Sequence, residues 1–214
     1  MTLGAKMAAG LGIPSAFAGS AFLGKDLIFP KPTDNSVRAK LAKEGYEFMS
    51  STDTGNWEKI YEVYKTKSGT DEFTQDEISN NESKDTGVPK LRSACERALS
   101  GSGEALYLLA RRFCVTPKTL DQLLTIKNIS KLNTEKTNSN TDDASWGLKV
   151  TEFKKNLDAN KSKTSWTLTE SESESQSNAN MNALKDGCQA LLSKQTYEDK
   201  FYDNLENFKT WCSK

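Results

Sequence analysis

Residues 91–100, LRSACERALS, and residues 184–193, LKDGCQALLS, share the pattern L-[KR]-x-x-C-x-x-[AL]-L-S. In the first copy Leu91, Cys95, Ala98 and Leu99 fall at i, i+4, i+7 and i+8, which places them on one face of an α-helix. The second copy repeats this spacing. The chain is therefore predicted to contain one amphipathic helix twice, each time with a cysteine on the apolar face.

The sequence around each of these helices is duplicated as well. A pattern W-x6-[FY]-K precedes each copy, and an aromatic-cysteine pair ends the segment that follows it. The matching residues are Trp57 and Trp146 at the start of the first pattern, with Phe113-Cys114 and Trp211-Cys212 at the end. Three matches in one order indicate an internal repeat, so we place helical module 1 at 34–115 and helical module 2 at 116–214.

Helical spacing of apolar residues continues through the rest of both modules, which predicts an all-α fold. Start signals for three helices are read at Thr116-Pro117, at Ser145 and at the capping-box-like Thr196 to Asp199. Residues 166–170, WTLTE, could form one short strand. The predicted fold class is all-α, with two similar small helical modules joined by polar loops behind an N-terminal hydrophobic helix.

Three polar stretches separate the helices, at 65–86, 133–143 and 170–180. They are rich in Ser, Thr, Asn, Asp and Glu, and such a composition buries too little apolar area to offset the entropy of an ordered chain. We expect them to be loops of low order.

The N-terminal residues 1–33 are read as a hydrophobic leader and a short linker. From Met7 to Gly24 there are 18 residues without a charge, the lower limit for a membrane-spanning helix. Lys6 and the run Ala16-Phe17-Ala18 also suit a cleavable signal peptide. A buried helix rich in glycine and alanine is a third reading. The basic residues after Gly24 favour a cytoplasmic body, although long domains often translocate regardless of such charges.

Each module carries two cysteines, Cys95 with Cys114 and Cys188 with Cys212. They could form one disulfide per module, remain as buried free thiols, or include a reactive thiol. In a simple antiparallel hairpin, the cysteines of the first pair miss each other by about 7 Å, and those of the second by about 15 Å. The second disulfide therefore requires a bent final helix or one that starts late.

Composition excludes several classes of chemistry. The chain has no histidine, which rules out Ser-His-Asp and Cys-His catalysis and HExxH zinc sites. Its 29 basic and 29 acidic residues balance, so no nucleic-acid partner is expected. No catalytic, cofactor-binding or metal-binding residues are predicted. The pair Asp142-Asp143 is read as the acidic start of a helix and the tryptophans as core residues.

The motifs in combination resemble a known group of proteins. The hydrophobic leader, KLAKEGYEFMS at 40–50, RRFCVTPKTLDQLL at 111–124 and NLENFKTWC at 204–212 are similar to the uncharacterised paralogous membrane or surface protein families of haemotrophic mycoplasmas. This resemblance implies a membrane-associated or surface-exposed protein, and it brings no catalytic residues with it.

Two functions are compatible with these features. The first is a non-enzymatic, membrane-anchored or surface-exposed protein with an extracellular body, involved in host interaction or antigenic. Its partners would be the membrane, through the N-terminal segment, and a host protein or another protein. The alternative is a cytoplasmic-facing structural or scaffold protein with reduced cysteines. Neither function requires a cofactor.

Overall fold

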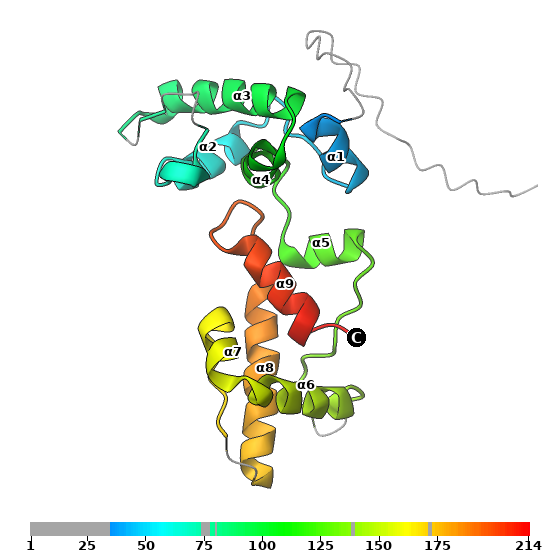
Figure 1. Cartoon of the computed structure of the whole chain (residues 1–214). Helices are drawn as coiled ribbons and strands as arrows, with labels where there is room; N and C mark the ends of the chain where they lie inside the picture. Colours follow the sequence, from blue (N-terminus) through cyan, green and yellow to red (C-terminus); the bar gives the residue numbers. More distant parts are fainter. Residues whose placement is uncertain (1–34, 74–77, 80, 138–139, 171–172) are drawn as a thin grey trace, which may run out of the picture. The chain divides into compact units, whose positions relative to one another are not determined.

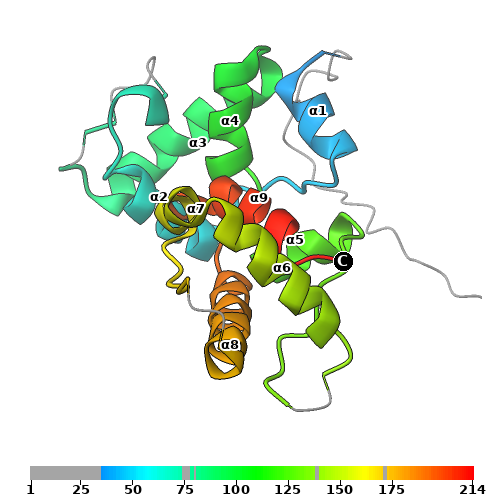
Figure 2. The ribbon, with the colours of Figure 1, turned by 60° about the horizontal axis from the view of Figure 1, so that its bottom comes forward.

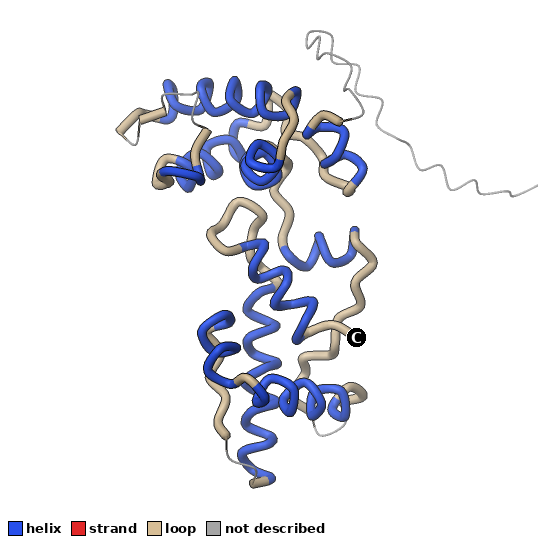
Figure 3. The backbone as a smooth tube through the Cα atoms, in the orientation of Figure 1, coloured by secondary structure: helices blue, strands red, loops and turns tan. Residues whose placement is uncertain are grey.

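The computed structural model describes residues 35–73, 78–79, 81–137, 140–170 and 173–214, and the predicted leader at 1–33 lies outside them. These residues form helices and loops, with no strand among them (Figure 3). The prediction of an all-α fold is confirmed. Figure 1 labels the elements, which are α1 (Val37–Lys43), α2 (Thr54–Tyr64), the 3-10 helix η1 (Gly69–Asp71), α3 (Lys84–Ser100), α4 (Glu104–Phe113), α5 (Leu120–Ile126), α6 (Asp143–Lys155), α7 (Leu157–Thr164), α8 (Glu174–Leu191) and α9 (Phe201–Trp211).

The same order of helices occurs twice. Each module begins with a short helix (α1 or α5), continues with the tryptophan helix (α2 or α6) and the long cysteine helix (α3 or α8), and ends with α4 or α9. In both modules the long helix packs against the tryptophan helix and against the last helix. Figures 1 and 2 show α3 and α4 side by side from two directions. Module 2 contains one additional helix, α7.

The turn after the short helix is the same in both modules. Its central residue adopts a left-handed conformation, with φ of 86° at Gly45 and 54° at Asn128. These are residue types that adopt this conformation readily. The next N–H then donates back into the helix, from Tyr46 to the Leu41 carbonyl (3.0 Å) and from Ile129 to the Leu124 carbonyl (2.9 Å).

The two ends of each module are joined by matching backbone contacts. An isolated antiparallel bridge links the segment after the short helix to the residue after the last cysteine, and one hydrogen bond beside it repeats. The start of each short helix is also tied to the end of the long helix. In module 1 these contacts are the Phe48–Val115 bridge and the hydrogen bonds from Thr116 N to Glu47 O and from Val37 N to Gly101 O. In module 2 they are the Lys131–Ser213 bridge and the hydrogen bonds from Lys214 N to Ser130 O and from Leu120 N to Lys194 O. The two modules are therefore similar down to individual hydrogen bonds.

The buried aromatic residues repeat in the same way. The indole N–H of Trp57 donates to the Ser50 carbonyl (2.9 Å), and that of Trp146 donates to the Asn133 carbonyl (2.8 Å). Edge-to-face pairs then join the tryptophan helix to the last helix. Their ring centroids are 5.1 Å apart for Tyr64–Phe113 and 5.0 Å apart for Phe153–Trp211. The expectation that the tryptophans are core residues is confirmed for Trp57, Trp146 and Trp211, which are at most 7% exposed.

The three predicted helix starts are each wrong. Helix α5 begins at Leu120 with Thr119 as its N-cap, because residues 116–118 are extended and bond to both modules. Thr119 and Gln122 form a capping box there. Helix α6 begins at Asp143 rather than after Ser145. Helix α9 begins at Phe201 after a left-handed Lys200, so no capping box forms at Thr196.

Parts of the first and third polar stretches are helical, where loops were predicted. Helix α3 begins at Lys84 and runs through Pro89, and its residues Gly87 and Val88 are buried. Helix α8 begins at Glu174, inside the third polar stretch, since extending an established helix adds one hydrogen bond per residue. Residues 166–170 form no strand: the side chain of Asn180 bonds the backbone N–H and carbonyl of Thr169, where a strand partner would be needed.

Candidate functional site

All four cysteines predicted as possible disulfide partners are paired within their own modules. Cys95 bonds Cys114 with Cα atoms 5.3 Å apart, and Cys188 bonds Cys212 with Cα atoms 5.8 Å apart. Each is at most 2% exposed, and no free cysteine remains. Of the three readings left open by the sequence, the structure matches one disulfide per module.

A late helix start allows the second disulfide to form. Helix α8 ends at Leu191 and α9 begins at Phe201, whereas residues 101–103 are enough to connect α3 to α4. The longer connection takes up the residues that would otherwise carry Cys212 past Cys188. Cys114 and Cys212 both occupy the C-cap of the last helix, where their N–H groups bond Ala110 and Phe208. Each disulfide therefore fastens the end of the last helix to the cysteine helix.

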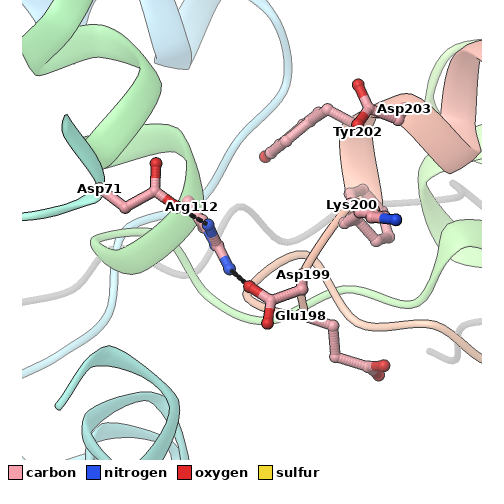
Figure 4. Close-up of a pocket in the computed structure, with 8 residues that line it drawn as sticks. Asp71, Arg112, Glu198, Asp199, Lys200, Tyr202 and Asp203 are labelled. Atoms are coloured by element: carbon pink, nitrogen blue, oxygen red, sulfur yellow. Dashed lines mark hydrogen bonds and ion pairs between the residues drawn. The ribbon is translucent and has the colours of Figure 1, made fainter. Parts of the chain in front are cut away.

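The long connection before α9 also reaches the other module, and both modules belong to one compact unit. Asp199 accepts a hydrogen bond from the ammonium group of Lys67 (2.6 Å) and another from the guanidinium of Arg112. Arg112 also pairs with Asp71 (3.3 Å) and donates to the Tyr197 carbonyl (3.3 Å). Figure 4 shows Arg112 between the two carboxylates, beside a hollow of about 470 Å³.

The charges of this junction are matched, so it holds the modules together rather than offering a reactive group. The Lys67 and Arg112 side chains are 10% and 14% exposed, and Asp199 is 65% exposed. The hydrogen bond from Lys67 is the largest cause that keeps the pKa of Asp199 below its ordinary value of 3.8, and the hydrogen bond from Arg112 lowers the pKa further. The carboxylate is therefore ionised at neutral pH, and its contribution to stability is lost as the pH falls through this lowered pKa.

We expect Asp199→Asn to lower the free energy of unfolding by about 1 kcal/mol near pH 7, because it leaves the nearly buried Lys67 without its anionic partner. The loss should shrink in about 1 M salt, and it should also shrink as the pH falls through the lowered pKa of Asp199, because the wild-type carboxyl then becomes protonated too. Urea unfolding of the wild-type protein and the variant measures this loss of unfolding free energy. Glu206→Gln, which breaks an exposed pair with Lys209, is the control and should cost less than about 0.5 kcal/mol. A loss that stays the same as the pH falls through that pKa would contradict the charge pairing.

A second hollow, of about 770 Å³, lies within module 2. Two ion pairs line it, Lys131 with Asp121 and Lys214 with Asp142. The positions equivalent to Asp121 and Lys131 in module 1 are occupied by Arg38 and Phe48, and the guanidinium of Arg38 lies 4.4 Å from the Phe48 ring centroid. The two copies of the fold have therefore diverged at this place.

The acidic pair at residues 142–143 lies at the start of α6, as predicted. Asp142 accepts a hydrogen bond from the Asn133 N–H (2.8 Å), which, together with Lys214, lowers its pKa. Asp143 pairs with Lys185 (2.7 Å), whose side chain is 3% exposed. Each carboxylate has its own partner, and both lie at the start of the helix.

Sequence reasoning did not identify the junction residues. Lys67 and Asp199 are far apart along the chain, and neither belongs to a repeated motif. Arg112 belongs to the quoted RRFC segment, but nothing in that segment indicates its carboxylate partners. The contact depends on the connection before α9, which has no equivalent in module 1.

Two further observations limit the chemistry of the described residues. They contain no group of three or more cysteine or acidic side chains placed to hold a metal ion. None of the helices described is both long and apolar enough to span a bilayer.

Comparison with protein families, curated proteins and solved structures finds no match to the chain.

Proposed function

We propose that this protein is a membrane-associated surface protein whose disulfide-linked helical body lies outside the cell and binds another protein, such as a host protein. One observation carries this proposal: every cysteine is in a buried disulfide, one in each copy of the module. Structural disulfides form and persist in oxidising compartments and are rare in a reducing cytoplasm.

The polar connection before α6 supports a role in presenting surface loops. Asn140 is 7% exposed, and its amide donates to the carbonyls of Asn133 (2.9 Å) and Glu135 (2.6 Å). The Trp146 indole N–H bonds the same Asn133 carbonyl. The loop is thus anchored to the core at its base, and loops held on a rigid scaffold commonly carry binding residues.

The sequence supports the same location. The uncharged segment from Met7 to Gly24 suits an anchor or a signal peptide, and the resemblance to mycoplasma surface protein families implies exposure to the host. Balanced charge and matched ion pairs favour a binding protein over an enzyme. The alternative, a cytoplasmic scaffold, requires reduced cysteines.

Alkylation with mass readout, on protein taken directly from its own cells, separates the two functions. We expect no thiol to be alkylated in denatured protein before reduction, and all 4 cysteines to be alkylated after it. Protease added to intact cells should remove the body, while a cytoplasmic protein of the same cells serves as the control for lysis. Four free thiols, or a body protected until the cells are lysed, would contradict the proposal and favour the scaffold.

A further inference from the structure

Arg111, in the last turn of α4, is held by aromatic rings. The carbon of its guanidinium group lies 3.6 Å from the ring centroid of Tyr202 and 5.1 Å from that of Tyr107. The Tyr202 hydroxyl donates to the backbone carbonyl of Arg111 (2.8 Å), and it is hydrogen-bonded to Tyr46. These contacts fix the position of the guanidinium, while no described residue accepts a hydrogen bond from its N–H groups.

The hydrogen-bond donors of Arg111 lack acceptors in the part of the chain that is described. Its Nε is buried and has no hydrogen-bond partner there. No carboxylate pairs with its guanidinium among those residues, whereas the adjacent Arg112 pairs with both Asp71 and Asp199. A buried donor without a partner costs free energy. Only the Nε is closed to solvent, so the donors that remain open to a ligand are those of the two Nη groups.

Arg111 lines a hollow of about 370 Å³, a volume suited to a small molecule. Tyr46, Tyr202 and the buried Leu205 give the hollow apolar surface. Lys127 lies on its wall, with its ammonium group 5.4 Å from the Tyr46 ring centroid, and forms no ion pair with a described residue. The hollow therefore combines an apolar wall with two cations, Arg111 and Lys127, that pair with no carboxylate of the described residues.

The acidic groups of the hollow limit the charge of the ligand. Glu44 accepts the Tyr107 hydroxyl at both carboxylate oxygens (2.8 Å each), and Glu206 pairs with Lys209 (2.6 Å). Asp203 adds a third carboxylate. Burial, together with the bond to Glu44, raises the pKa of Tyr107 to about 12, so that phenol stays neutral. Three carboxylates disfavour a dianion such as phosphate and leave a monoanion as the suitable ligand.

We propose that this hollow binds a small monocarboxylate with an apolar body, whose carboxylate pairs with the guanidinium of Arg111 and whose body packs on the tyrosine rings. Arginine binds carboxylates through two parallel N–H bonds, which is the geometry that a fixed and unpaired guanidinium offers. This site goes beyond the proposed function, because it requires no particular cellular location.

Titration of the intact, isotope-labelled protein with sodium benzoate tests the site, with sodium chloride holding the ionic strength constant. We expect the Nε–H NMR signal of Arg111 to shift and saturate, while that of Arg112 stays in place. Arg111→Lys keeps the charge but removes the paired donors, so it should weaken benzoate binding about tenfold or more. Arg112→Lys is the matched control. It should leave the affinity for benzoate within about twofold, because the guanidinium of Arg112 is already paired with Asp71 and Asp199.

Three results would overturn the site. The first is a shift of the same size at both arginines that does not saturate. The second is saturation by chloride alone, and the third is binding of the neutral analogue benzamide as tight as that of benzoate. The shift measured on the wild-type protein decides the question even if Arg111→Lys does not fold. Failure of benzoate binding would leave the disulfide and cell-surface tests of the proposed function unaffected, so the two proposals fail separately.

Discussion

Replacing both cysteines of either disulfide with alanine should lower the free energy of unfolding by about 3 kcal/mol. The disulfides close loops with sequence separations of 19 and 24 residues, and the entropy they remove from the unfolded chain depends only weakly on loop length. The two losses should therefore differ by only about 0.2 kcal/mol. Chemical unfolding of Cys95→Ala/Cys114→Ala and Cys188→Ala/Cys212→Ala measures both losses.

The comparison of the two variants also tests the duplication. Each disulfide anchors the end of the last helix, so each variant should free α4 or α9 first and leave the other module protected from hydrogen exchange. Ser100→Ala, at the exposed end of the cysteine helix in module 1, controls for alanine substitution near the bridge and should change stability by less than about 0.5 kcal/mol. If only one of the two double variants lost stability, the two bridges would not have equivalent roles.

Features of the fold that follow from local spacing could be predicted from the sequence. The stripe Leu91, Cys95, Ala98, Leu99 requires a helix with one buried face, and all four residues are buried. The repetition placed two cysteines in each module, but the sequence left a disulfide, free thiols and a reactive thiol as alternatives, and the structure shows the disulfides. The turns at Gly45 and Asn128 were not predicted, because dissimilar residues reach the same left-handed conformation there.

What the sequence could not reveal depends on contacts distant along the chain. The start signal at Thr116 was misread because residues 116–118 bond to both modules, which keeps them extended. Residues 166–170 could have formed one short strand, but they do not, because the side chain of Asn180 takes the place of a partner strand. Arg111 and Arg112 are adjacent and identical in type, yet Arg112 is paired with carboxylates and Arg111 lies over tyrosine rings. No local pattern distinguishes them.

Gly87→Ala should destabilise the protein by about 3 kcal/mol, although alanine is the better helix former by about 1 kcal/mol. A Cβ atom at residue 87, inside α3, would overlap the ring of Tyr61. That ring cannot move aside, because Tyr61 is fully buried and its hydroxyl donates to the Glu82 carbonyl (2.9 Å). Either the tyrosine must leave its pocket, or α3 must separate from α2.

Two other glycines provide the comparison within the same chain. Gly187, inside α8, faces Trp166 in the same way, but Trp166 is only half-buried and can shift, so Gly187→Ala should cost about 1 to 2 kcal/mol. Gly147, in α6, has open space around its Cα, so Gly147→Ala should stabilise the protein by up to about 1 kcal/mol. Urea unfolding of the three variants should rank them in this order. If Gly87→Ala matched Gly147→Ala, the close packing of α3 on Tyr61 would be refuted, since helix propensity alone would then account for both.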